Sequence, residues 1–188
     1  MYKRQQLINH DVSRKVLESV AEQSNWGRAL PDGHGLGLAF VLSFGVPTAQ
    51  VIEVAAVDDT IKLIKAWAAV DVGVALDPRN VKAQVMGGMN FGLAAAMMGE
   101  ITVKDGEVQQ SNFHNYPSMR FNQAPDIEVQ VLENGDRVRG IGEPGVPPAA
   151  PALGNAIFAA TGKRIRELPF SKHAVSYTHL TLPTRRFV

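Results

Sequence analysis

The first part of the chain changes from a helical to a strand-like pattern of hydrophobic positions. Val12, Val16, Leu17 and Val20 recur at helical spacing within residues 11–24, which predicts an amphipathic helix. Asp11 or Ser13 would cap its first turn. Residues 26–37 then read as a loop, with a turn at 31–33. Strands rich in Val and Ile are predicted over three ranges, 36–44, 50–57 and 61–70, with Pro47 and Asp58-Asp59 in the connections between them.

A second helix is predicted from Asp77 to about Met98. Asp77 is a good N-cap, Pro78 suits the first helical position, and Gly99 would end the helix. This helix contains Gly87, Gly88 and Gly92. A glycine within a helix costs up to about 1 kcal/mol relative to alanine. We therefore expect that something approaches this helix closely.

The remainder predicts more strands and one further helix. Short strands at 101–103 and 108–110 would be joined through Asp105-Gly106, and another strand is expected at 127–132 before a turn at 134–135. The last helix would span 149–161, with Gly162 after its end. The order of elements predicts an α+β fold with mixed sheet elements and two main helices.

The two ends of the chain do not read as protein sequence. Residues 175–184 are what GTC TCT TAT ACA CAT CTG ACG CTG CCG ACG encodes, and residues 1–5 match GTG TAT AAG AGA CAG. Both resemble a transposase adapter used in sequencing libraries. We therefore expect residues 1–5 and 174–188 to be adapter-like ends, residues 6–173 to be the protein, and the chain to be a piece of a longer one.

This division changes the charge balance. The ends hold four basic and no acidic residues, so 15 Lys and Arg stand against 18 Asp and Glu in the remainder, a net charge of −3. No basic patch interleaved with aromatic residues remains, which argues against nucleic-acid binding. No apolar run approaches the roughly 20 residues of a membrane span. The chain has no cysteine, so it can ligate neither an iron–sulfur cluster nor a thiolate-bound zinc.

Three glycines and a histidine within residues 33–37 first suggest a nucleotide loop. Gly33, Gly35 and Gly37 precede a predicted strand, however, whereas a dinucleotide fingerprint follows one. Neither His34 nor His114 has a Glu or His at ligand spacing. We expect neither a nucleotide site nor a protein metal site here, and hydrogen-bonded or solvated histidines instead.

Glu143 lies in an unusual setting, between glycines and prolines in the segment 140–148 that precedes the last helix. Glycines let a backbone approach a ligand closely, and prolines stiffen the turn. One interpretation is a general base presented to a large cofactor. The other is a carboxylate that satisfies free amides at the start of the helix. Gln84 has similar alternatives, because the glycines beside it suit either a flat ligand or close packing.

Taken together, these segments resemble the large subunits of molybdenum hydroxylases, the xanthine dehydrogenase and aldehyde oxidoreductase family, and in particular the isoquinoline 1-oxidoreductase β-subunit group. The resemblance covers residues 6–173. It is carried, in this order, by residues 70–78, 83–88, 99–102, 111–116, 142–153 and 159–164. Met86 stands where the family often has glutamate, and Asp77 where it often has asparagine.

The resemblance implies part of a larger domain that binds molybdopterin, usually as the cytosine dinucleotide. It implies that Glu143 is the general base, that Gln84 contacts the pterin, and that Gly87 and Gly88 belong to the same cofactor-binding motif. The reaction would hydroxylate an N-heterocycle or an aldehyde with oxygen derived from water. Electrons would leave through a small subunit that carries [2Fe–2S] clusters.

Two further expectations follow. Because most of the site would lie elsewhere in the polypeptide, we expect the chain by itself to be inactive. The alternative to an enzyme is a non-catalytic binding or packing module in which Glu143 only caps a helix.

Overall fold

The structure is a computed structural model that describes residues 9–57 and 60–173. The predicted adapter-like ends, 1–5 and 174–188, lie outside this part of the chain, as do Asp58 and Asp59. Within it, no helix is both long and apolar enough to span a membrane. The elements are α2 (Asp11–Gln23), β1 (His34–Ser43), β2 (Val46–Val57), β3 (Thr60–Asp71), α3 (Pro78–Met98), β4 (Val103–Lys104), β5 (Glu107–Val108), the 3-10 turn η1 (Phe121–Gln123), β6 (Asp126–Leu132), α4 (Ala149–Thr161) and the 3-10 turn η2 (Phe170–Lys172).

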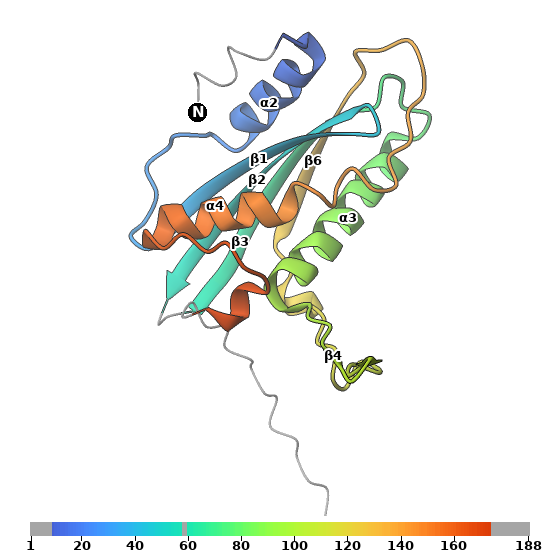
Figure 1. Ribbon diagram of the computed structural model, residues 1–188. Coiled ribbons are helices and arrows are strands. Elements are labelled where there is room, and N and C mark those ends of the chain that lie inside the picture. Colours follow the sequence, from blue (N-terminus) through green and yellow to red (C-terminus); the bar gives the residue numbers. More distant parts are fainter. Residues whose placement is uncertain (1–8, 58–59, 174–188) are drawn as a thin grey trace, which may run out of the picture.

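The main sheet has four strands in the order β1-β2-β3-β6 (Figure 1). β2 pairs antiparallel with β1 and with β3, whereas β6 pairs parallel with β3. A parallel neighbour requires a crossover connection, and α3 lies in that connection. The predicted α+β fold with a mixed sheet is confirmed, with α2 as a third helix beside the two main ones.

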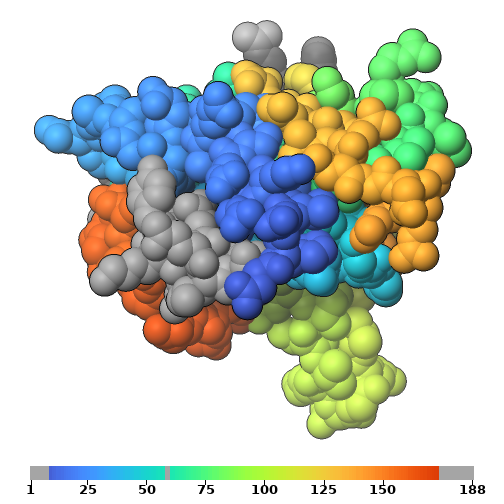
Figure 2. Space-filling view, turned by 90° about the horizontal axis from the view of Figure 1, so that it is seen from above, coloured from blue at the N-terminus to red at the C-terminus, as the bar shows by residue number. Residues whose placement is uncertain are grey.

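Helices cover both faces of this sheet. Leu17 and Val20 of α2 pack with Val51 and Trp67 on one face. α3 and α4 cover the other face, where Ile52 belongs to the larger hydrophobic core. Alternate residues of β2 therefore enter different cores, and the strand is buried continuously from Val46 to Ala55. The β4–β5 hairpin lies outside both layers and projects from the body of the molecule (Figure 2).

The hairpin between β1 and β2 differs from the prediction in its position. Phe44 and Gly45 form the turn, both with positive φ, and Pro47 lies inside β2. A proline within a strand removes one ladder hydrogen bond. Here that loss is tolerated, because β2 begins to pair with β3 only at Thr48, one residue after Pro47.

The predicted helix ends are correct for two helices and wrong for one. The Asp77 carboxylate accepts hydrogen bonds from the backbone N–H groups of Arg79 and Asn80 at the start of α3. Gly162 follows α4 with φ of 72°. α2, in contrast, has His10 as N-cap and no side-chain capping bond. The predicted caps have other partners there, because Asp11 pairs with Arg14 at 2.5 Å and Ser13 Oγ lies 2.6 Å from His10 Nδ1.

Gly35 and Gly37 belong to β1, not to a loop, because the strand begins at His34. A Cβ on Gly35 would overlap the backbone of Ala156 and Ala160, and a Cβ on Gly37 would overlap that of Ala152 and Ala156. The two glycines thus let α4 lie directly on β1. Asn155 Nδ2 adds a hydrogen bond of 3.0 Å to the Leu38 carbonyl oxygen.

This contact predicts that Gly37→Ala weakens the fold. The added methyl group would push α4 away from β1, and overpacking of this kind costs about 1–3 kcal/mol. We expect a lower midpoint of urea unfolding for the 188-residue chain. Gly140→Ala is the matched control, because a Cβ at Gly140 meets no atom within 4 Å. Equal midpoints for the two variants would contradict the proposed role of Gly37.

Candidate functional site

One face of α3 is uncharged and open. The helix has no charged residue from Ala83 to Met98. Gln84, Gly87 and Phe91 follow one another at helical spacing and are exposed, Phe91 by 70%. A Cβ built on Gly87 would meet no atom within 4 Å. Packing within the described chain therefore does not explain why this position is a glycine.

The segment between β6 and α4 packs against the same helix, beside this face (Figure 1). A Cβ on Gly88 would lie 3.2 Å from Gly145 Cα, and one on Gly145 would lie 2.8 Å from the Val85 carbonyl oxygen. A Cβ on Gly92 would likewise lie 2.7 Å from the Val146 carbonyl oxygen. These glycines let the two backbones touch. Contact within the chain thus accounts for Gly88, whereas Gly87 remains open.

Glu143 begins a tight turn in this segment. The Val146 N–H donates to the Glu143 carbonyl oxygen at 2.8 Å, while Pro144 and Gly145 are buried. The Glu143 side chain is exposed and has no hydrogen-bond or ion-pair partner among the described residues. α4 begins after Pro148 without a side-chain cap. The side chain of Glu143 therefore does not cap this helix.

Gln50 of β2 holds this turn from the side of the sheet. Its Nε2 donates to the Gly145 carbonyl oxygen at 2.7 Å, and the residue is fully buried. The role of Gln50 is not among the predictions from sequence. The available signal was an amide side chain within a strand otherwise rich in Val and Ala, where a buried polar group needs a partner.

His34 and His114 have separate surroundings in the structure. His34 Nδ1 lies 2.9 Å from Glu53 Oε1, and the other oxygen of Glu53 pairs with Arg28 at 2.5 Å. His114 is exposed in the segment between β5 and η1. Residues 9–57 and 60–173 contain no group of three or more His, Cys, Asp or Glu residues that could hold a metal. A hydrogen-bonded His34 and a solvated His114 match the expectation from sequence.

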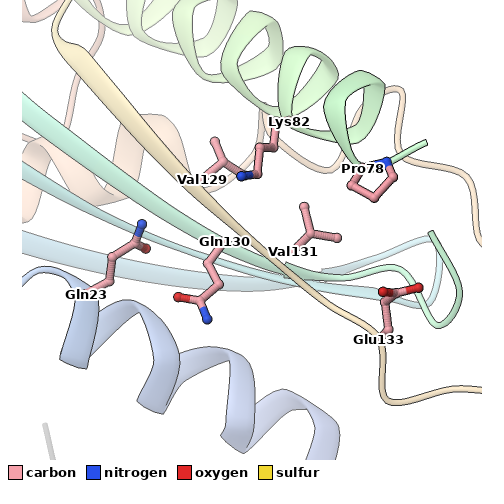
Figure 3. A pocket seen from close by; sticks show the side chains of 7 residues that line it. All are labelled: Gln23, Pro78, Lys82, Val129, Gln130, Val131 and Glu133. Atoms are coloured by element: carbon pink, nitrogen blue, oxygen red, sulfur yellow. The ribbon is translucent and has the colours of Figure 1, made fainter. Parts of the chain in front are cut away.

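A cleft of about 400 Å³ lies beside β6, the edge strand of the sheet (Figure 3). It is lined by Gln23, Pro78, Lys82, Val129, Gln130, Val131 and Glu133. Neither Glu143 nor Gln84 lines it. The predicted residues occupy an open surface of the described chain, formed by the face of α3 and the turn that begins at Glu143. A closed site would require further polypeptide over this surface.

The sequence matches the model of a known family. Residues 5–125 match the molybdopterin cofactor-binding domain. This range contains the sheet strands β1 to β3 and the whole of α3. It ends before the turn at Glu143.

Individual relatives extend the similarity along most of the chain. The β subunit of isoquinoline 1-oxidoreductase from Brevundimonas diminuta is 39% identical over 159 residues, which are 82% of this chain and 20% of that protein. The membrane-bound aldehyde dehydrogenase [pyrroloquinoline-quinone] of Gluconacetobacter polyoxogenes is 31% identical over 161 residues, 82% of this chain and 21% of that protein. The chain thus spans about a fifth of the length of these relatives.

Comparison with solved structures supports the fold. Quinoline 2-oxidoreductase from Pseudomonas putida 86 superimposes with a TM-score of 0.58 at 22% identity, over 66% of this chain and 17% of that one. On the family match and these similarities, the chain belongs to the molybdopterin-binding large subunits of molybdenum hydroxylases, the xanthine dehydrogenase and aldehyde oxidoreductase family.

Proposed function

We propose that this chain forms part of the catalytic site of a molybdenum-dependent hydroxylase, with Glu143 as the general base. The observation that carries the proposal is the unpaired carboxylate of Glu143, on a turn that is packed against α3 beside its uncharged face. A general base needs a fixed position and a free lone pair. The turn provides the first, and the absence of a partner among the described residues leaves the second available.

The face of α3 has the features that a large flat cofactor requires. The Gln84 amide offers both a donor and an acceptor, and the side chain is exposed. Gly87 leaves open space where any other residue would place a side chain. We propose that Gln84 and Gly87 contact the pterin, and that Gly88 contributes by letting the turn of Glu143 approach the helix.

The cofactor, proposed to be the molybdopterin cytosine dinucleotide, would supply the two-electron redox chemistry when bound. Glu143 would take up the proton that is released as oxygen from water adds to an electron-poor carbon of an N-heterocycle or an aldehyde. The chain contains no cysteine that could ligate an iron–sulfur cluster. We propose that the electrons pass to a small partner subunit with [2Fe–2S] clusters, and that the chain alone has no turnover.

The first test is Glu143→Gln in the complete enzyme with its partner subunit. The amide cannot accept the proton, so we expect kcat to fall by about 10²–10⁴-fold. The molybdenum content should stay at the wild-type level, because the turn keeps its backbone contacts. Oxidation of isoquinoline and of an aldehyde would be measured per bound molybdenum.

The matched control is Glu107→Gln, an exposed carboxylate on the projecting β4–β5 hairpin. This variant should keep wild-type turnover. If Glu143→Gln kept both its molybdenum and near-normal turnover, Glu143 would not be the base. The alternative of a non-catalytic packing module would then gain support.

The second test is Gly87→Leu. The Cβ of a leucine at this position would meet no atom of the described chain within 4 Å. Leucine also stabilises a helix by about 1 kcal/mol relative to glycine. The isolated chain should therefore be as stable as wild type, or more so. If the cofactor lies on this face, the complete enzyme should bind much less molybdenum, as measured by metal analysis.

The neighbouring Met86→Leu change conserves side-chain volume and should leave the metal content unchanged. A Gly87→Leu enzyme with a full complement of molybdenum would exclude Gly87 from the cofactor site.

A further inference from the structure

We propose that Gln50 is a positioning residue for Glu143, through its hydrogen bond to the backbone of the turn. The inference rests on the proposed function of Glu143 as the base. Gln50 lies on β2, and Nε2 reaches the Gly145 carbonyl oxygen at 2.7 Å across 95 residues of sequence. Its role is thus distinct from any direct contact with a substrate or cofactor.

The burial of Gln50 is the first argument. The side chain is fully buried, and its Oε1 has no hydrogen-bond partner among the described residues. Burying an amide with an unsatisfied acceptor costs free energy that an apolar side chain of the same size would not. Packing alone would therefore favour methionine or leucine. Among the described residues, the hydrogen bond to Gly145 is the one contact that the amide makes and that these side chains could not make.

The construction of the turn is the second argument. The hydrogen bond from Val146 N–H to the Glu143 carbonyl oxygen closes residues 143–146 into one unit. Gly145 touches Val85 and Gly88 of α3 on one side and accepts the Gln50 hydrogen bond from the sheet. The turn is thus fixed between two elements, two residues from Glu143. Pro144 between them has a restricted φ, which limits how far Glu143 can move independently.

The consequence concerns catalysis more than binding. Without the Gln50 amide, the buried carbonyl oxygen of Gly145 would lose its donor, and the turn would shift to find another one. A general base must remain within hydrogen-bond reach of the proton that it removes. A displacement of about 1 Å can cost about 10²-fold in rate. Gln84 and Gly87, the proposed cofactor contacts, lie on α3 and not on the turn, so we expect them to keep their positions.

The test is Gln50→Met in the complete enzyme with its partner subunit. Methionine matches glutamine in length, adapts readily to a core, and has no donor. We expect kcat per bound molybdenum to fall by about 10- to 100-fold, with KM for isoquinoline within about twofold of wild type and the molybdenum content retained. This separation of kcat from KM and metal content is not expected from general loss of structure.

Thr48→Val is the matched control. Thr48 lies two residues before Gln50 on the same face of β2, is fully buried, and has an Oγ1 without a hydrogen-bond partner among the described residues. This change removes a buried polar group from the same strand without removing a bond to the turn. We expect its kcat to equal that of wild type.

The double variant with Gln50→Met and Glu143→Gln decides whether Gln50 acts through Glu143. If it does, the double variant should be no slower than Glu143→Gln alone. An equal loss from Gln50→Met in both backgrounds would overturn the inference, as would a wild-type kcat for Gln50→Met or an enzyme without molybdenum. If Glu143→Gln kept its turnover, the proposed function itself would fail. If only Glu143→Gln lost turnover, the base would stand and the role of Gln50 would not.

Discussion

Close backbone contact between α3 and the turn of Glu143 is the constraint on which the proposed site depends. Two segments far apart in the sequence meet at Gly88, Gly92 and Gly145, with no side chain between them. At such short range, even one methyl group would separate the two backbones. Glycines within a long helix lower its stability. Here they allow the close contact that fixes the turn of Glu143. Glu143 owes its position to this contact.

The same device appears a second time, where α4 lies on β1. Gly35 and Gly37 let that helix approach the sheet, and α4 directly follows the turn of Glu143. The turn is therefore fixed at its C-terminal end by α4 and along its length by α3. Gln50 reaches it from β2 beneath. Three elements thus hold a carboxylate that makes no bond of its own within the described chain.

Local signals were sufficient to predict much of this architecture. Asp77 and Pro78 together identify the start of α3, and Gly162 the end of α4, because each acts on its own immediate backbone. The family resemblance likewise predicts that Gln84, Gly87 and Glu143 belong to one site. Gln84 and Gly87 lie on α3, and the turn of Glu143 packs against that helix.

Interactions between distant segments could not be predicted in this way. From sequence, Gly35 and Gly37 suggested a loop. These positions need glycine because α4 packs on them, and α4 lies more than a hundred residues later in the chain. Gln50 gave no local sign of its contact with Gly145. Pro47 suggested a connection between strands because proline has no backbone N–H to donate. Only the register of β3, which begins to pair at Thr48, shows that no hydrogen bond is needed there. The roles of residues that make tertiary contacts can therefore be assigned only once the fold is known.

The most direct measurement of the central claim is an experimental structure of the complete enzyme with its cofactor bound. We expect the pterin to lie on the face of α3, in contact with Gln84 and against Gly87. The Glu143 carboxylate should point at the reacting centre from the turn fixed by Gly88 and Gly145. A cofactor bound elsewhere, with Glu143 facing solvent or a packing interface, would contradict the account.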